Sequence, residues 1–427
     1  MTDALTERQR EVAGLVAEGL TNRQVAEQLG ISKDGVKYHV TEILSRLGVS
    51  SRASVREALW GPPEGAPAQP TAQPASEPGE VDFAKHLLDA MRGSLLQRVL
   101  RIATATGVVE ALRESPPASV MAIAGATGID VRYARAILQS LAAHRVVSYR
   151  AATRQFRLAP PQRALLTPER PDSFLDLIDS TTPRDPADDR LIALIRAGEG
   201  VRLEAGMANE WENLIHILPR PAHGLAPAFR AAPGLAESLE RGISVGEAGS
   251  GRGRLLIELA RTYPRSRFTG YDLNPTAVRL SAADAQEADV GNCDFVEADV
   301  TQLPERHDLM LAFGMLHDTP NPGAIVEAVA RIIAPGGLFV ATEVAASSRL
   351  ERNLGRPLME VMYDLSLMHC VPHSVACGGD GLGALWGQEA TRDLLAAAGL
   401  DVEVVRSQSD AFHNYFVATA GGRPAPN

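Results

Sequence analysis

The chain is poor in cysteine and lacks any long apolar run, and each shortage excludes a class of protein. Only 3 of its 427 residues are cysteines, Cys293, Cys370 and Cys377, and no two of them form a CxxC pair. This excludes a disulfide-stapled scaffold and the common zinc-ribbon spacings. Nowhere do about 18 apolar residues follow one another, and the first residues carry no signal-peptide core. We therefore expect a soluble, cytoplasmic protein with no membrane partner.

An excess of basic residues is also missing. The net charge of −10 argues against a protein that coats nucleic acid along its whole length. Residues 1–60 nevertheless carry 8 acidic and 8 basic side chains, so the acidic excess lies downstream of them. The hydrophobic share of 45% and the charged share of 22% are typical of globular proteins, and the length predicts two or three domains.

Changes in composition and periodicity along the chain predict its domain boundaries. Residues 61–80 contain 6 prolines and no large apolar side chain, which predicts an extended linker. Residues 81–168 show helical spacing and then two β-like runs, a winged-helix pattern. Residues 169–240 are helical and interrupted by prolines. Between residues 241 and 427, β-like and helical runs alternate and end in an antiparallel strand pair, so we expect an α/β fold with a seven-stranded sheet.

The first sixty residues resemble the LuxR-type helix-turn-helix of bacterial regulators, through the stretches LTERQREV, GLTNRQVAEQLGIS and GVKYHVTEILSRLGV. Thr21 or Asn22 can cap a helix that ends at Gly30. Ser32 can cap the next helix, which would enter the major groove of DNA. Gly35 departs from the threonine usual in this family and costs the helix about 1 kcal/mol.

Basic side chains in this second helix suit contact with DNA phosphates. The resemblance implies that the residues contacting DNA are Lys33, Lys37, His39 and Arg46. Bases outnumber acids from Lys33 to Arg56, and Arg52 is among them. An alternative is that the module has lost DNA binding and serves only for dimerisation.

A glycine-rich turn, EAGSGRG at residues 247–253, follows an apolar strand-like run and precedes a helical one. Glycines let backbone approach a ligand closely, and the N-terminus of the next helix offers free N–H groups to a carboxylate or phosphate. The dinucleotide-binding fingerprint fails at Arg254, where its third glycine would stand.

Acidic residues at the ends of the following strands extend this pattern, with YD at the second strand and EADV at the third. Together with the turn, they resemble the class I S-adenosylmethionine-dependent methyltransferases, which implies S-adenosylmethionine as the cofactor. The resemblance places Glu247 and the glycine turn at the methionine end, Asp272 at the ribose, and Asp299 at the adenine. The full set of implied cofactor residues is Glu247, Gly249, Ser250, Gly251, Gly253, Asp272, Leu273, Asp299, Val300 and Phe313.

The winged-helix segment and the stretch YDLSLMHCVPHSVACGGDGLGALWG resemble a narrower group, the small-molecule methyltransferases of secondary metabolism. In that group the extra domain dimerises, so a homodimer and a small-molecule partner are implied. Residues 169–240 would form the wall of the substrate cavity. The group's O-methyltransferases use a histidine soon after the fifth strand, which makes His369 the candidate general base.

Two further residues are candidates for the catalytic site. His317 follows the fourth strand, and Glu343 ends the fifth strand and can orient a base. The cluster His369-Cys370-x-x-His373-x-x-x-Cys377 matches no structural zinc spacing and looks like a glycine-rich loop, so we expect no metal.

Three functions remain open at this point. The chain can be a methyltransferase for a small aromatic or polyketide-like metabolite, with the helix-turn-helix as a regulatory or vestigial appendage. It can be a transcriptional regulator whose methyltransferase-like part senses S-adenosylmethionine or a metabolite. It can also bind the cofactor for a reaction other than methyl transfer. The intact cofactor residues favour the first.

Overall fold

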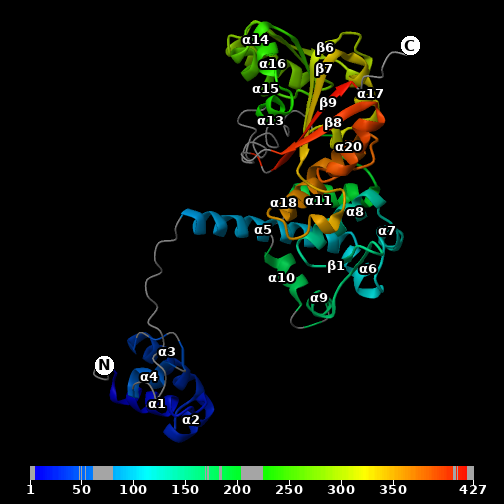
Figure 1. Ribbon diagram of the computed structural model, residues 1–427. Coiled ribbons are helices and arrows are strands. Elements are labelled where there is room, and N and C mark those ends of the chain that lie inside the picture. The colour runs from blue at the N-terminus through cyan, green and yellow to red at the C-terminus, as the bar shows by residue number, and fades with distance from the viewer. Residues whose placement is uncertain are drawn as a thin grey trace. The chain divides into compact units, whose positions relative to one another are not determined.

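A computed structural model describes the chain apart from residues 1–4, 48, 50, 53, 61–79, 169, 171–172, 182–184, 203–224, 407–409, 411 and 421–427. Nearly all of the expected linker therefore lies outside the described residues. The chain divides into two compact units, Met1–Phe83 and Ala84–Asn427 (Figure 1). Among the described helices, none combines the length and the apolar character needed to cross a membrane.

The first unit is a bundle of short helices around a small apolar core that includes Val12, Val25, Val36 and Ile43. Its helices are α1 (Glu7–Ala17), α2 (Asn22–Leu29), α3 (Lys33–Leu47) and α4 (Ser54–Trp60). Thr21, and not Asn22, caps α2, and its side chain and that of Gln24 form a reciprocal capping box. Gly30 ends α2 in the left-handed conformation, at φ 63°. Ser32 caps α3 by accepting the Gly35 N–H at 3.0 Å.

The second unit begins with the winged helix. Its elements are α5 (Glu80–Ala105), α6 (Val108–Glu114), α7 (Val120–Thr127), α8 (Val131–Ala143), β1 (Ser148–Arg150) and β2 (Gln155–Arg157). β1 and β2 pair antiparallel, as expected of a wing. Further described helices before the sheet are α9 (Pro160–Leu165), α10 (Phe174–Thr181), α11 (Pro186–Ala197), α13 (Ala226–Ala231) and α14 (Leu235–Arg241).

The expected seven-stranded sheet is confirmed, with strand order β5-β4-β3-β6-β7-β9-β8. Its strands are β3 (Ser244–Ala248), β4 (Arg267–Asp272), β5 (Cys293–Glu297), β6 (His307–Phe313), β7 (Ile333–Val344), β8 (Leu400–Arg406) and β9 (His413–Ala420). The first five run parallel, and β9 pairs antiparallel with both β7 and β8. The helices between them are α15 (Arg254–Thr262), α16 (Pro275–Glu287), α17 (Pro322–Ile332) and α20 (Gln388–Ala397).

The strand order places the glycine-rich turn at a switch point of the sheet. β3 lies between β4 and β6, so the chain leaves it in one direction and later returns to its other side. Open α/β sheets bind ligands at such a point, outside the carboxyl ends of the strands. Two apolar clusters, one centred on Phe339 and Phe416 and the other on Phe268 and Leu309, hold the sheet to its helices.

The segment after β7 is helical, which corrects the expected glycine-rich loop around His369. It forms α18 (Met359–Leu365), a single π-helical turn η5 (Ser366–Cys370), and α19 (Val371–Ala376). The reason is burial: Met362, Leu365 and Leu367 pack in the same apolar cluster as the winged helix. The glycines that suggested a loop begin only after α19.

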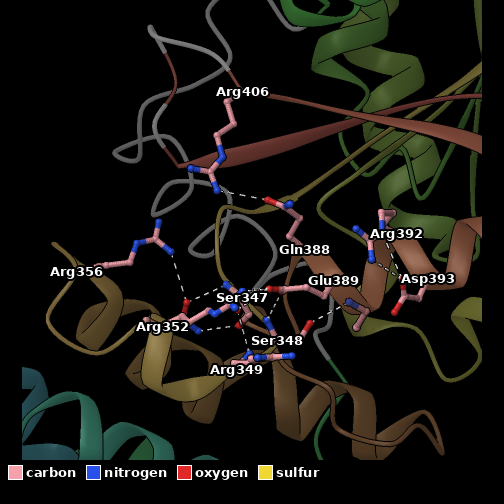
Figure 2. Close-up of polar contacts among 12 residues, drawn as sticks. Ser347, Ser348, Arg349, Arg352, Arg356, Gln388, Glu389, Arg392, Asp393 and Arg406 are labelled. Atoms are coloured by element: carbon pink, nitrogen blue, oxygen red, sulfur yellow. Dashed lines mark hydrogen bonds and ion pairs between the residues drawn. The ribbon is translucent and has the colours of Figure 1, made fainter.

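A hydrogen-bonded carboxylate fixes the chain between β7 and α18. Glu389, in the first turn of α20, accepts the Ser347 hydroxyl at 2.8 Å and the Ser348 N–H at 2.7 Å (Figure 2). The Arg352 guanidinium lies 3.2 Å from it. Burial raises the pKa of Glu389, but these donors outweigh it and lower the pKa to about 2.

Candidate functional site

The glycine-rich turn after β3 adopts a backbone that side chains other than glycine disfavour. Gly249, Gly251 and Gly253 all lie in the left-handed region, at φ 64°, 52° and 65°. Space is tight as well, since a Cβ atom on Gly253 would lie 2.1 Å from the Phe295 ring. Gly253 also stands directly before α15, so the N-terminus of that helix points its free N–H groups at the turn.

Glu247 is the most perturbed acid beside the turn. Its side chain is 5% exposed, and its Oε2 atom has no hydrogen-bond partner within the described part of the chain. Burial, and then the charge of Asp272, raises the pKa of Glu247 to about 8. A buried carboxylate without a donor is unfavourable, and the cationic amino group of a methionine end would satisfy it. The residues present therefore fit S-adenosylmethionine.

Asp272 holds the turn and keeps capacity for a ligand. Its Oδ2 accepts the Gly251 N–H at 2.9 Å, and its Oδ1 accepts the Asn274 N–H at 2.8 Å. Each carboxylate oxygen can accept a second hydrogen bond, which ribose hydroxyls can supply. Leu273 follows directly after β4, and its side chain is 70% exposed.

The other expected cofactor residues differ in how they face the site. The Ser250 hydroxyl is buried next to Gly270, where a Cβ atom would lie 2.6 Å from Oγ. Asp299 is exposed, and its Oδ1 caps the short turn η2 (Val300–Gln302). Val300 is buried, so its backbone is the part that can meet an adenine ring. Phe313 is half-buried at the end of β6.

The structure brings His317 and Glu343 together. His317 lies in η3 (Leu316–Asp318), after β6, and its Nδ1 atom is 2.6 Å from Oε2 of Glu343 at the end of β7. The Glu343 carboxylate also accepts the Leu316 N–H at 3.1 Å and the Trp386 indole N–H at 3.2 Å. Burial lowers the pKa of His317, but the charges of Asp318 and Glu343 outweigh it and hold that pKa well above its ordinary value.

His369 lies apart from this pair, on the π-helical turn η5. Its ring is half-buried, and burial together with the positive charge of Arg98 lowers its pKa to about 4. The ring is therefore neutral at pH 7. The other residues of its sequence cluster do not gather around it. Cys377 lies 3.9 Å from His373, and Cys370 packs beside His317.

Met315 and Trp386 are two further residues of this region that contact the predicted site residues. A Cβ atom on Gly249 would lie 3.1 Å from Met315, so the segment after β6 packs on the glycine-rich turn. Trp386 donates its indole N–H to Glu343 at 3.2 Å. A sulfur side chain two residues after a strand end is the signal that could have marked Met315.

In the first unit, Lys33, Lys37 and Arg46 are exposed on α3, and Arg46 lies 3.6 Å from Glu42. His39 is half-buried. Arg52 is not available for phosphates, because its guanidinium donates to the Asn22 side chain at 2.6 Å and to the Leu20 carbonyl. Tyr38, which the sequence analysis passed over, is 65% exposed on α3 between two expected DNA contacts.

Comparison with known families finds matches for three segments of the chain. Residues 3–57 match the family of bacterial regulatory proteins of the LuxR type, residues 94–168 match an Rv2258c-like winged helix-turn-helix domain, and residues 239–399 match a methyltransferase domain. The chain thus combines three segments that match a LuxR-type helix-turn-helix, a winged helix-turn-helix and a methyltransferase domain. These matches confirm the family resemblances expected from the sequence.

Curated relatives match single domains of the chain. A probable transcriptional regulatory protein SgaR of Hyphomicrobium methylovorum is 47% identical over 51 residues, which is 12% of this chain and 24% of that protein. A ubiquinone biosynthesis O-methyltransferase of Albidiferax ferrireducens is 34% identical over 100 residues, 22% of this chain and 39% of that protein. The chain thus spans well under half the length of these relatives.

A solved structure shares the fold of the methyltransferase part. The O-methyltransferase family 2 protein of Planctomyces limnophilus, solved in complex with apigenin, aligns with a TM-score of 0.59 at 18% identity. The alignment covers 79% of this chain and 96% of that one. At this identity the likeness concerns the fold.

Proposed function

We propose that this protein transfers a methyl group from S-adenosylmethionine to an oxygen atom of a small-molecule acceptor. The observation that carries the proposal is the buried Glu247 carboxylate, with an unpaired Oε2, directly before a turn of left-handed glycines. A carboxylate in that place costs stability unless a cationic ligand binds it. The acceptor is proposed from the likeness to small-molecule O-methyltransferases.

The chain's own residues would bind and align the reactants. Glu247 would pair with the amino group of the cofactor, Asp272 would accept its ribose hydroxyls, and Asp299 its adenine amino group. S-adenosylmethionine supplies an activated methyl group, so the protein's task is to hold the acceptor oxygen in line with it. The described parts of residues 169–240 remain our proposed wall of the acceptor cavity, whereas residues 203–224 of that range lie outside the described residues. A homodimer remains our proposed assembly.

An oxygen nucleophile also requires removal of its proton, and we propose His369 for this step. It stands on η5, after the fifth parallel strand, with a neutral and half-buried ring. His317 is less suited, because the charges of Asp318 and Glu343 outweigh its burial and hold its pKa well above the ordinary value, and a ring that keeps its proton cannot take one from the acceptor. We assign His317 and Glu343 to positioning the segment between the cofactor turn and η5.

The test is turnover of labelled S-adenosylmethionine by the full-length protein with a panel of phenolic and other hydroxylated metabolites. Formation of S-adenosylhomocysteine with a methylated product supports the proposal. His369→Gln should lower turnover about 10²–10⁴-fold and leave cofactor affinity unchanged. His86→Gln, at an exposed position on α5, is the matched control and should match wild type. Tight cofactor binding without transfer to any acceptor would favour a sensor.

A second function, sequence-specific DNA binding, is supported by α3. We propose that this helix enters the major groove with Lys33, Lys37 and Tyr38 facing the DNA. Both α2 and α3 have the caps that fix their ends, and the three side chains are exposed. Binding requires two copies, since one small helix-turn-helix buries little surface. A dimeric enzyme would supply the two copies.

A further inference from the structure

Three different metal-binding groups converge between β6 and η5. His317 and Asp318 belong to η3, and Cys370 is the last residue of η5. An imidazole nitrogen, a carboxylate oxygen and the thiol sulfur of these residues all lie within 4.8 Å of one another. Across the described ranges, no other group of three or more His, Cys, Asp or Glu side chains converges in this way.

The Asp318 carboxylate is under-satisfied in this cluster. Its Oδ1 atom is buried and accepts no hydrogen bond from the residues that the structure describes. The Nε2 atom of His317 lies 3.3 Å from it, close enough for both to bind one ion. A metal ion bound there would replace the Nε2 proton of His317 and the thiol proton of Cys370, because metal ligands must be deprotonated, and it would pair with the Asp318 carboxylate in their place.

Glu343 orients the imidazole in the way that metal-binding histidines require. It lies 2.6 Å from Nδ1 of His317, which leaves Nε2 facing Asp318 and Cys370. The Leu316 N–H and the Trp386 indole fix the Glu343 carboxylate in turn. Metal-binding histidines almost always donate their second N–H to a carboxylate, carbonyl or water, which fixes the ring orientation.

We propose that His317, Asp318 and Cys370 bind one Zn²⁺ ion, with Glu343 as the carboxylate behind the histidine. One nitrogen, one oxygen and one sulfur donor suit this borderline-soft ion, which prefers four tetrahedral ligands. Three protein ligands leave the fourth position for water or another donor. The ion joins two segments that are far apart in the sequence, one after β6 and one after β7. This site does not depend on the proposed methyl transfer.

The binding test uses the full-length protein, stripped with a chelator, reloaded with Zn²⁺ and freed of excess ion by gel filtration. Elemental analysis should find one zinc per chain. Cys370→Ser and Asp318→Asn should each weaken zinc binding at least about 10-fold in competition with a chromophoric chelator, and Glu343→Gln about 10–100-fold. Cys377→Ser is the matched control, a cysteine at the C-terminal end of α19 that is absent from the converging group, and it should bind like wild type.

Cobalt replaces zinc in a second measurement that reports the sulfur ligand directly. Co²⁺ bound to wild type or Cys377→Ser should show a thiolate charge-transfer band, and Cys370→Ser should not. Circular dichroism checks that each variant is folded, and Asp318→Asn keeps the assignment testable if Cys370→Ser unfolds. Wild type that retains no zinc overturns the proposal. So does a folded Asp318→Asn variant of undiminished affinity, or a charge-transfer band that persists without Cys370.

Discussion

The imidazole of His317 lies 2.6 Å from the carboxylate of Glu343, and both side chains are buried, at 5% and 1% exposure. The two residues come from neighbouring parallel strands, at the carboxyl ends of β6 and β7. Two further donors, the Leu316 N–H and the Trp386 indole, point at the same carboxylate. Glu343 therefore joins three segments of the chain next to the cofactor turn.

Removing Glu343 should destabilise the methyltransferase domain strongly. Glu343→Ala leaves a buried imidazole without its carboxylate, and loss of one partner of a buried pair typically costs about 3–5 kcal/mol. Glu343→Gln should cost less, because the amide oxygen still accepts one hydrogen bond. Chemical denaturation measures both, with Glu403→Ala on the exposed face of β8 as a control expected within about 0.5 kcal/mol of wild type. Equal stability of Glu343→Ala and Glu403→Ala would contradict the role of Glu343.

The sequence predicts the order of elements well and their contacts poorly. The alternation of β-like and helical runs, and the antiparallel pair that closes the sheet, match the order of β3 to β9. His317 and Glu343 were separate candidates, and nothing in the sequence says that they touch. Only the neighbouring positions of β6 and β7 bring them together.

The hydrophobic periodicity of the sequence also could not predict the buried polar contacts between α8 and α18. Asp364 on α18 is fully buried, where it accepts the Ser140 hydroxyl and lies 2.7 Å from His144, both at α8 or its end. An acid in an apolar helical run gives no sign of its partner. The prediction of a loop around His369 was wrong. The glycines that favour a loop stand after Cys377, whereas the residues before Cys377 carry apolar side chains at helical spacing.

The tight contact of Gly253 with Phe295 predicts a graded response to substitution. Gly253→Ala places a methyl group 2.1 Å from the Phe295 ring and requires a left-handed backbone from alanine. Overpacking of this kind typically costs about 1–3 kcal/mol, and the displaced turn should bind S-adenosylmethionine at least about 10-fold more weakly. Thermal unfolding and calorimetric titration measure the two effects. Gly291→Ala, where no atom lies within 4 Å of the new Cβ, should change neither.

The raised pKa of Glu247 predicts that the stability of the protein depends on pH. Folded Glu247 keeps its proton up to about pH 8, because burial and Asp272 raise its pKa, whereas the unfolded carboxyl loses it near 4.5. The folded state binds more protons between these values, so this residue makes the free energy of unfolding fall as pH rises from about 5 to 8. Glu247→Gln should remove that slope, and exposed Glu240→Gln should keep it. Parallel profiles for wild type and Glu247→Gln would show that the carboxyl is already ionised.

The same carboxyl should release a proton when the cofactor binds. The cationic amino group of S-adenosylmethionine favours the charged form of Glu247, so its pKa falls on binding. Calorimetric titrations at pH 7 in buffers of different ionisation enthalpy measure the protons released. Wild type should release close to one, and Glu247→Gln should release none while binding more weakly. Proton release that survives in Glu247→Gln would assign it to another group.

Substitution of Lys37 tests whether the helix-turn-helix binds DNA. It is exposed on α3, so its loss cannot disturb the core, and a lysine on a phosphate contributes about one unit to the slope of affinity against salt concentration. Lys37→Ala should therefore weaken binding to DNA fragments selected by the full-length protein and flatten that slope by about 1. Lys85→Ala, on α5 and equally exposed, removes the same charge outside the helix-turn-helix and is the matched control. Fluorescence anisotropy over a range of salt concentrations separates the two variants. If they behave alike, or if selection yields no preferred sequence at low salt, α3 does not contact DNA and the module serves only as an appended helical domain.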